Sequence, residues 1–141
     1  MSHDALYWNR MNDPVIARFR QNAGVVNGRR WPLILLTTIG ARSGQPRVTP
    51  LNFSTDAGRI VVIASKGGSA THPGWYLNLV ANPEVTIETG TETFRARATI
   101  AQEPERTRLF DQQAAQMAFF DSYRQRVTAR QIPVVIFDRL D

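Results

Sequence analysis

The sequence predicts an α+β fold, in which a small antiparallel β-barrel of about six strands is flanked by helices. Three observations support this class. Between Leu33 and Ile100, short segments rich in β-branched residues alternate with turn residues. Two of the connections have the composition of hairpin turns, and helical spacing of apolar residues occurs mainly near the two ends of the chain. Short strands joined by hairpins favour a barrel over a doubly wound parallel sheet.

The 141 residues are most simply one domain, 1–141, which buries about two thirds of the surface that its unfolded chain exposes. The chain has no cysteine, which excludes disulfides and thiolate-bound clusters. It shows no signal peptide and no apolar stretch long enough to span a bilayer. These features predict a soluble cytoplasmic protein.

The N-terminal segment, residues 1–23, is expected to form an amphipathic helix. Trp8, Val15 and Phe19 recur at helical spacing, and Pro14 is expected to kink or restart the helix. Packing of the apolar stripe against the core is the favoured role. Association with a membrane surface is the alternative.

The remaining elements follow from length, β-branched content and turn residues. Strands are expected at 33–39, 48–53, 59–65, 84–89, 93–100 and 132–138, with hairpin turns at 55–58 and 90–92. Helices are expected at 72–81, 104–118 and 119–128, and residues 22–32 are expected to form a loop.

The loop at residues 40–47 has the composition of an anion-binding site. Glycines let backbone N–H groups converge, Ser43 adds a hydroxyl, and Arg42 and Arg47 offer forked donors that match phosphate or carboxylate oxygens. Taken alone, an ordinary β-turn with solvated arginines explains this loop equally well.

The single lysine of the chain, Lys66, lies in a second loop of similar character. It follows the third strand, beside two glycines, and precedes the helix expected at 72–81, whose N-terminus carries unpaired N–H groups. Trp75 and Asn78 lie three residues apart on that helix and would present an aromatic plane and an amide to a flat heterocycle. The alternative is that Trp75 belongs to the core and Asn78 is a capping or surface residue.

The net charge of +5 comes from the first half of the chain, since residues 1–80 carry nine Arg or Lys against three Asp or Glu. This asymmetry indicates an anionic partner. No DNA-reading motif is present, and the aromatic residues are not interleaved with basic ones, so nucleic acid is not the expected partner. Neither a metal-binding motif nor a hydrolase motif accompanies the two histidines or Ser65. A redox cofactor that carries the chemistry itself suits this profile.

Several motifs occur together and in one order: LLTTIGARSGQPR at 35–47, VTPL at 48–51, ASKGG at 64–68, HPGWYLNL at 72–79, ANP at 81–83 and IPVV at 132–135. With these motifs the chain resembles the deazaflavin-dependent nitroreductase and quinone reductase family from about residue 33 to residue 137. The resemblance implies an FMN-binding split-barrel-like fold and coenzyme F420, whose 8-hydroxy-5-deazaflavin ring carries a phosphodiester and an oligoglutamate tail.

Reduced F420 donates a hydride from its C5 carbon. The implied activity is therefore F420H2-dependent reduction of a quinone or another electron-poor enone, carbonyl or nitro acceptor. Two alternatives are an FMN-dependent split-barrel oxidoreductase and a non-catalytic basic module that binds nucleic acid or a membrane.

The resemblance also implies roles for particular residues. Those expected to hold the phosphate and tail are Arg42, Ser43, Gly44 and Arg47. Those expected to border the phosphate and ring are Pro50, Ala64, Ser65, Lys66, Gly67, Trp75 and Asn78. Ser65 and Tyr123 are the candidate catalytic residues, and no metal is implied.

The acceptor is expected to contact Met117, Phe120 and Tyr123. Family members known for nitroimidazole reduction are tyrosine-rich along the helix after the fifth strand. This chain has one phenol there, that of Tyr123. An apolar surface with a single hydroxyl favours a quinone-like acceptor over a nitro compound. Core packing of Phe119, Phe120 and Tyr123 is the alternative.

Overall fold

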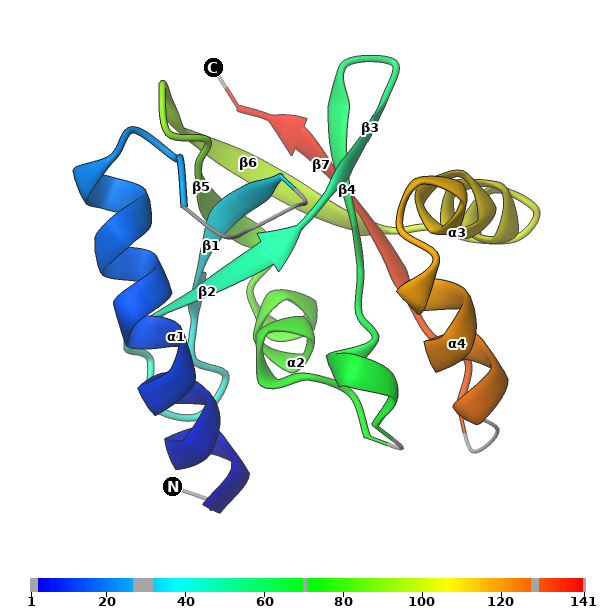
Figure 1. The fold of residues 1–141 in the computed structure, drawn as a ribbon, viewed down its shortest axis with the longest axis horizontal. Helices are drawn as coiled ribbons and strands as arrows, with labels where there is room; N and C mark the ends of the chain where they lie inside the picture. Colours follow the sequence, from blue (N-terminus) through cyan, green and yellow to red (C-terminus); the bar gives the residue numbers. More distant parts are fainter. Residues whose placement is uncertain (1–2, 27–31, 70, 128–129, 141) are drawn as a thin grey trace.

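The computed structural model describes residues 3–26, 32–69, 71–127 and 130–140. Its centre is a seven-stranded antiparallel sheet in the order β2-β1-β5-β6-β7-β4-β3, with helices packed around it (Figure 1). In chain order the described elements are α1 (His3–Gln21), β1 (Leu33–Ile39), β2 (Pro46–Asn52), β3 (Ser54–Asp56), β4 (Arg59–Ile63), the 3₁₀ turn η1 (Lys66–Gly68), α2 (Gly74–Ala81), β5 (Glu84–Glu88), β6 (Thr93–Ile100), α3 (Glu105–Gln116), α4 (Phe119–Arg126) and β7 (Val134–Arg139).

The sheet curls into a half-barrel because of how its two edge strands are connected. β2 and β3 stand at opposite ends of the strand order, yet only Phe53 separates them in the chain. One residue advances the chain by less than 4 Å, so the two edges of the sheet must come together. Figure 1 shows β2 leading directly into β3. The predicted α+β split-barrel class is confirmed.

Strands β1 and β7 are buried on both faces over most of their length, which explains their unbroken apolar runs. In β1, Leu36 belongs to the cluster inside the barrel, whereas Leu35 belongs to the cluster beneath α1. In β7, Val135 lies inside, and Val134 lies in the cluster under α3 and α4. Because successive side chains of a strand point to opposite faces, a two-sided cover requires an unbroken apolar run.

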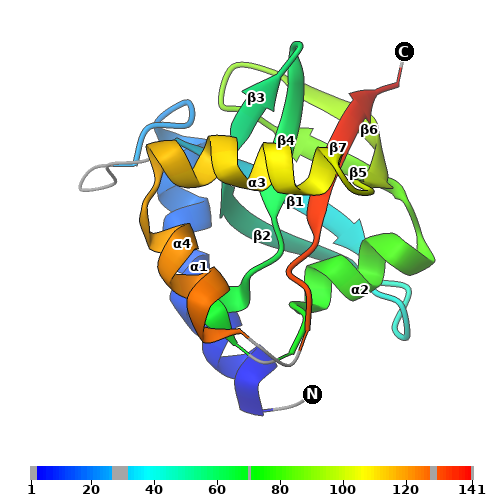
Figure 2. The ribbon, with the colours of Figure 1, turned by 90° about the vertical axis from the view of Figure 1, so that its right-hand side faces the viewer.

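Each helix contributes aromatic or aliphatic side chains to one of these clusters. Phe19 of α1 packs on the outer face of the sheet over β1. Phe110 of α3 and Phe120 of α4 pack on the same outer face over β4 and β7, farther round the barrel (Figures 1 and 2). Trp75 and Leu79 of α2 join the cluster inside the barrel. No described helix combines the length and the apolar character that a membrane passage needs.

The hairpin turn expected at 55–58 would pair the strand expected at 48–53 with β4, and this expectation was wrong. β4 pairs with the short strand β3, because Ala57 and Gly58 have φ values of 51° and 78° and close a tight turn immediately after Asp56. β2 pairs instead with β1 along its whole length. The sheet therefore has seven strands rather than six.

The break expected at Pro14 does not occur, because α1 is continuous from His3 to Gln21. Proline removes one N–H donor, but Val15 and Phe19 are buried against Leu35, and this packing stabilises the helix beyond the proline. Residues 27–31 of the expected loop and residue 128 of the expected last helix lie outside the described residues.

Candidate functional site

The loop between β1 and β2 has a shape fixed by its own hydrogen bonds. The N–H of Gly40 donates to the carbonyl of Gln45 at 2.8 Å, and the N–H of Gly44 donates to the carbonyl of Gly40 at 3.0 Å. The hydroxyl oxygen of Ser43 accepts from the N–H of Gln45 at 3.2 Å. Gly44 has a φ of 69°, which glycine adopts without steric cost. The predicted anion loop is thus a compact, defined turn.

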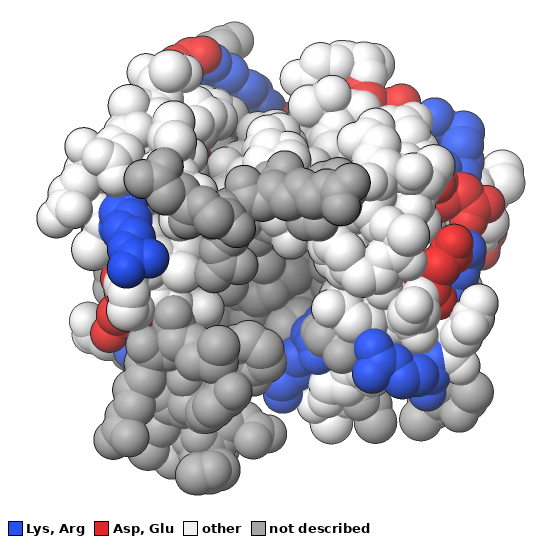
Figure 3. Space-filling model, viewed as in Figure 1, with Lys and Arg blue, Asp and Glu red and all other residues white. Residues whose placement is uncertain are grey.

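Arg42 of this loop and Arg47 at the start of β2 are exposed, and neither forms an ion pair with an acidic residue in the described part of the chain. Several arginines elsewhere are paired, as Arg108 is with Asp56 at 3.0 Å. Basic side chains gather below the centre of the face in Figure 3, between α1 and α4. Two unpaired guanidinium groups fit a ligand that carries phosphate or carboxylate.

Asn78 connects this loop to α2. Its Oδ1 accepts from the N–H of Ala41 at 3.0 Å, and its Nδ2 donates to the hydroxyl of Thr38 at 3.1 Å. Both ends of the amide therefore bind protein groups of β1 and of the loop. The structure brings Asn78 together with the predicted anion loop, and the contact that it shows is with the loop backbone.

The second predicted loop, residues 64–69, leads from β4 through η1 toward α2. Ala64 and Ser65 are buried, and Lys66 has a left-handed φ of 50°. The Nζ of Lys66 donates to the hydroxyl of Thr71 at 3.2 Å. Lys66 is half-exposed, so its ammonium lies at the surface.

Arg130, which sequence reasoning missed, holds the 64–69 segment. Its guanidinium donates to the carbonyls of Ala64 at 3.1 Å, Ser65 at 2.8 Å and Ser69 at 3.1 Å. It also donates to Nδ1 of His72 at 3.1 Å, since a guanidinium has no acceptor. The only local signal is an arginine ahead of an apolar strand, because the partners lie 58 to 66 residues earlier in the chain.

The helix α4 brings Tyr123 against η1. A Cβ placed on Gly68 would lie 3.1 Å from Cδ1 of Tyr123, and Gly68 has a φ of 81°, so glycine suits this contact. The Tyr123 ring meets Phe120 edge-on, with centroids 5.8 Å apart, and the Arg126 guanidinium carbon lies 5.3 Å from its centre. The candidate catalytic phenol and the segment of Lys66 thus belong to adjoining elements.

Several residues expected to contact a ligand lie largely in the core. Trp75 is 8% exposed and packs inside the barrel, while Met117 and Phe120 pack under α3 and α4. Pro50 is half-buried on β2, opposite Leu35 of β1. Core packing, the alternative that the sequence left open for Trp75 and Phe120, is what the structure shows.

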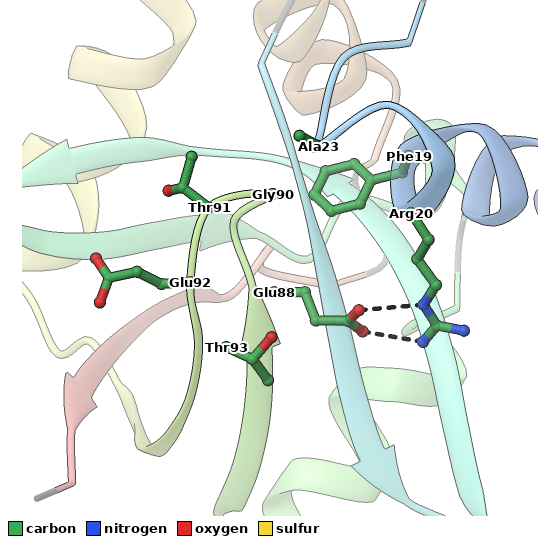
Figure 4. Close-up of a pocket in the computed structure, with 8 residues that line it drawn as sticks. All are labelled: Phe19, Arg20, Ala23, Glu88, Gly90, Thr91, Glu92 and Thr93. Atoms are coloured by element: carbon green, nitrogen blue, oxygen red, sulfur yellow. Dashed lines mark hydrogen bonds and ion pairs between the residues drawn. The ribbon is translucent and has the colours of Figure 1, made fainter.

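Two hollows lie apart from these loops. One of about 350 Å³ is lined by His72, Glu103, Arg106 and their neighbours. The other, of about 180 Å³, lies between the end of α1 and the β5–β6 turn, where Arg20 donates two hydrogen bonds to Glu88, at 3.1 and 2.9 Å (Figure 4). Neither is lined by residues of the β1–β2 loop or by Lys66, so the predicted cofactor residues lie outside both hollows.

Comparison with known proteins matches this arrangement to one family. The family described as F420H(2)-dependent quinone reductase matches residues 8–139. An F420H(2)-dependent quinone reductase of Mycobacterium tuberculosis is 40% identical over 111 residues, which are 77% of this chain and 74% of that protein.

Solved structures are similar over most of their length. A structure of an F420-H2 dependent reductase (FDR-A) has a TM-score of 0.70 and 34% identity, and the match covers 82% of this chain and all of that one. Another, described as a domain-swapped dimer, has a TM-score of 0.72 and 31% identity and covers 95% of this chain and 99% of that one.

The family match spans nearly the whole chain, and the sequence identity extends over more than two thirds of it. The unpaired arginines, the glycine turns and the curled antiparallel sheet are consistent with the family match and with the similarity to these relatives. This chain therefore belongs to the F420H(2)-dependent quinone reductase family and is an F420H2-dependent oxidoreductase with a split-barrel fold.

Proposed function

We propose that this reductase transfers a hydride from reduced F420 to a quinone, and that the β1–β2 loop and the 64–69 segment hold the anionic groups of the cofactor. The observation that carries the assignment of the site is the placement of Arg42, Arg47 and Lys66. They lie on two segments that flank α2, and Asn78 of α2 binds the backbone of the first. Phosphodiester and carboxylate oxygens are the groups that such donors recognise.

When bound, F420H2 supplies the hydride, and the quinone takes up that hydride and one proton to become a hydroquinone. The chain's own residues orient the two reactants and exclude water between them. Ala64, Ser65, Gly67 and Pro50 border the proposed ring position. Ser43 and Gly44 shape the turn that carries the arginines.

The acceptor would lie beside α4. Phe119 and Tyr123, whose ring centroids are 5.6 Å apart, present aromatic surface next to η1, and the Tyr123 phenol is the nearest candidate to donate a hydrogen bond to a quinone oxygen. Ser65 is the second candidate for that donation. A flat aromatic acceptor matches this surface better than a charged one does.

A fluorescence titration with F420H2 tests the cofactor site, followed by mixing with menadione as a soluble quinone. We expect saturable binding at micromolar concentration and cofactor oxidation that depends on the quinone. Absence of binding at that concentration would end the proposal. Binding without quinone-dependent oxidation would reject the acceptor class alone.

Arg42→Ala and Lys66→Ala are expected to weaken F420H2 binding by about tenfold each, because a charge-assisted hydrogen bond contributes about 1.5–3 kcal/mol and exposure reduces it. The single-turnover rate at saturating cofactor should change by less than about threefold, since neither side chain is proposed to act on the reacting atoms. Arg95→Ala is the matched control, because Arg95 is exposed and pairs with Glu84 on the β5–β6 hairpin. A large loss of single-turnover rate in either variant would contradict the assigned roles.

We also propose a cytoplasmic location with peripheral contact between α1 and the membrane surface. In support, the last turn of α1 carries Arg18 and Arg20, and Arg18 has no acidic partner among the described residues. Basic side chains on a surface helix favour anionic lipid. The protein should co-sediment with phosphatidylglycerol vesicles at low salt and be released at 0.5 M NaCl, because at that salt concentration the screening length between the arginines and the lipid falls to about 5 Å or less. No retention at low salt would reject the contact.

A further inference from the structure

Arg130 fixes both ends of the 64–69 segment with one side chain. Its donors reach the carbonyls of Ala64 and Ser65 at the start of the segment and that of Ser69 at its end. The remaining contact, with Nδ1 of His72, anchors the guanidinium to the residues that precede α2. Among the described residues no carboxylate pairs with Arg130, so its charge is met by neutral acceptors, the three carbonyls and Nδ1 of His72.

This arrangement dictates where the N–H groups of the segment point. A trans peptide is planar, and its C=O and N–H bonds point in opposite directions. Because the carbonyls of Ala64 and Ser65 face Arg130, the N–H groups of Ser65 and Lys66 are directed to the opposite side. The turn hydrogen bonds within the segment use other donors, the N–H groups of Gly68 and Ser69.

The backbone angles of the same two residues form an anion-binding geometry. Ser65 is right-handed, with φ of −83° and ψ of −31°, and Lys66 is left-handed, with φ of 50°. Successive residues of opposite hand make their N–H groups converge on one point, the concave arrangement called a nest. A lysine in the left-handed region is strained by about 1 kcal/mol, and such strain persists only where the surroundings hold it.

We propose that Arg130 is a positioning residue: it orients the peptides of the 64–69 segment so that the N–H groups of Ser65 and Lys66 form a nest for an oxyanion of F420. The inference rests on the proposed cofactor site and adds to it a backbone anion site. Arg130 does not touch the cofactor in this arrangement. Its unneutralised charge behind the loop adds to the positive potential of the nest.

The oxyanion comes from one of two parts of F420: the side chain, with its phosphodiester and carboxylates, or the ionised oxygen of the 8-hydroxydeazaflavin ring. Both parts offer anionic oxygens of a size that two N–H donors accommodate. The deazaflavin riboside, which lacks the phosphate and the tail, separates them. If Arg130→Gln weakens binding of F420 alone, the nest holds an anion of the side chain, whereas weaker binding of both compounds assigns the nest to the ring oxygen.

The experiment compares Arg130→Gln and Arg130→Lys with Arg106→Gln. Arg106 is the matched control, because it too donates to a buried backbone carbonyl, that of Ile132 at 2.8 Å, but it contacts no residue of the 64–69 segment. Thermal unfolding is measured for all variants, so that loss of fold is detected separately. Arg130→Gln should weaken F420 binding by tenfold or more, Arg130→Lys should restore part of it, and Arg106→Gln should leave it unchanged.

A second readout does not depend on F420. Inorganic phosphate is titrated into ¹⁵N-labelled protein, and the backbone amide signals of Ser65 and Lys66 are followed by NMR. They should move saturably in the wild type and in Arg106→Gln, and not in Arg130→Gln. Equal shifts in Arg130→Gln, or none in the wild type, would overturn the inference. Phosphate shifts without any F420 binding by the wild type would keep the nest and reject the proposed function instead.

Discussion

His72 is partly buried beside the guanidinium of Arg130, and both its burial and this charge favour the neutral form of the imidazole. Its Nδ1 accepts from Arg130 at 3.1 Å, so its proton belongs on Nε2. Its ring lies against that of Tyr76, with centroids 4.8 Å apart. Burial, and then the charge of Arg130, lower the pKa of His72. Protonation would place two cations in contact and remove the acceptor that steadies Arg130.

This pKa shift predicts a loss of stability in mild acid. The pKa of His72 is lower in the folded state than its ordinary value of about 6.5, so below that pH the unfolded chain binds the proton first. The contribution is present above about pH 6.5 and declines as pH falls toward the folded pKa. Urea unfolding between pH 7.5 and 5.5 should show the decline.

His72→Asn is expected to flatten that decline, because an amide atom takes the place of Nδ1 without titrating. Hydrogen bonds from Thr107 lower the pKa of Glu103, which lines the same hollow, so its carboxylate does not titrate in this range. An unchanged pH dependence in His72→Asn would assign the effect to other groups.

Local composition suggests candidate residues, whereas contacts with distant partners leave no signal in the sequence. Arg42 and Arg47 were proposed because glycine and arginine in a tight turn indicate an anion loop, and that role stays a prediction. Asn78 was proposed as a ligand-facing amide, but its hydrogen bonds to Ala41 and Thr38 span some forty residues and could not be read from the sequence. Arg130 was missed for the same reason.

At the scale of elements, the end of α1 is fastened to the β5–β6 hairpin through backbone contact. A Cβ on Gly90 would lie 2.4 Å from the carbonyl oxygen of Ala23, and one on Gly24 would lie 2.9 Å from the Cα of Gly90. The adjacent ion pair of Arg20 and Glu88 joins the same two elements (Figure 4). Two glycines thus allow a helix and a turn to approach more closely than side chains would permit.

Gly90→Ala is therefore expected to destabilise the fold by about 2–4 kcal/mol, since it combines overpacking of about 1–3 kcal/mol with a left-handed strain of about 1 kcal/mol. Gly58→Ala is the control, because Gly58 also has a positive φ, 78°, but nothing lies within 4 Å of its added Cβ. That variant should lose only about 1 kcal/mol. Urea unfolding measures both losses, and equal losses would contradict close packing at Gly90.

The ends of a helix or strand could be predicted where its residue pattern stopped at a recognisable turn sequence. The ranges expected for β1 and β6 match the observed strands, because each alternation or apolar run ends at a clear turn. β3 was not predicted, since its three residues are too short to show a period and had been assigned to the turn. The continuous α1 shows core packing outweighing the local preference of Pro14.

At the scale of the molecule, the acidic side chains are largely neutralised by arginines, whereas part of the basic charge is not. The described basic residues without an acidic partner are Arg18, Arg42, Arg47, Lys66, Arg97, Arg126 and Arg130. Five of these lie on the β1–β2 loop and the start of β2, in the 64–69 segment, or on α4 and the chain beyond it: Arg42, Arg47, Lys66, Arg126 and Arg130. The excess charge that composition predicted is therefore concentrated in part around the proposed cofactor site.

This distribution predicts salt-sensitive cofactor binding. Raising NaCl from 0.1 to 1 M shortens the screening length from about 10 to about 3 Å, so exposed charges such as Arg42 and Arg47 should lose most of their attraction for F420. We expect the dissociation constant to rise by about tenfold or more, and to rise less in Arg42→Ala. Equal salt dependence in that variant and the wild type would show that the loop does not meet the anionic groups.

The position of β7 in the sheet has a consequence for how the protein is made. β7 pairs with β4 on one side and with β6 on the other, so it is the strand that joins the β3–β4 hairpin to β2, β1, β5 and β6 in one sheet. A ribosome delivers residues Val134–Arg139 after the other six strands of the sheet, at about 5–20 residues per second. Arg130 emerges just before them. The half-barrel and the support of the 64–69 segment are therefore completed together, after the other strands have been made, and a nascent chain stopped before residue 130 would lack both.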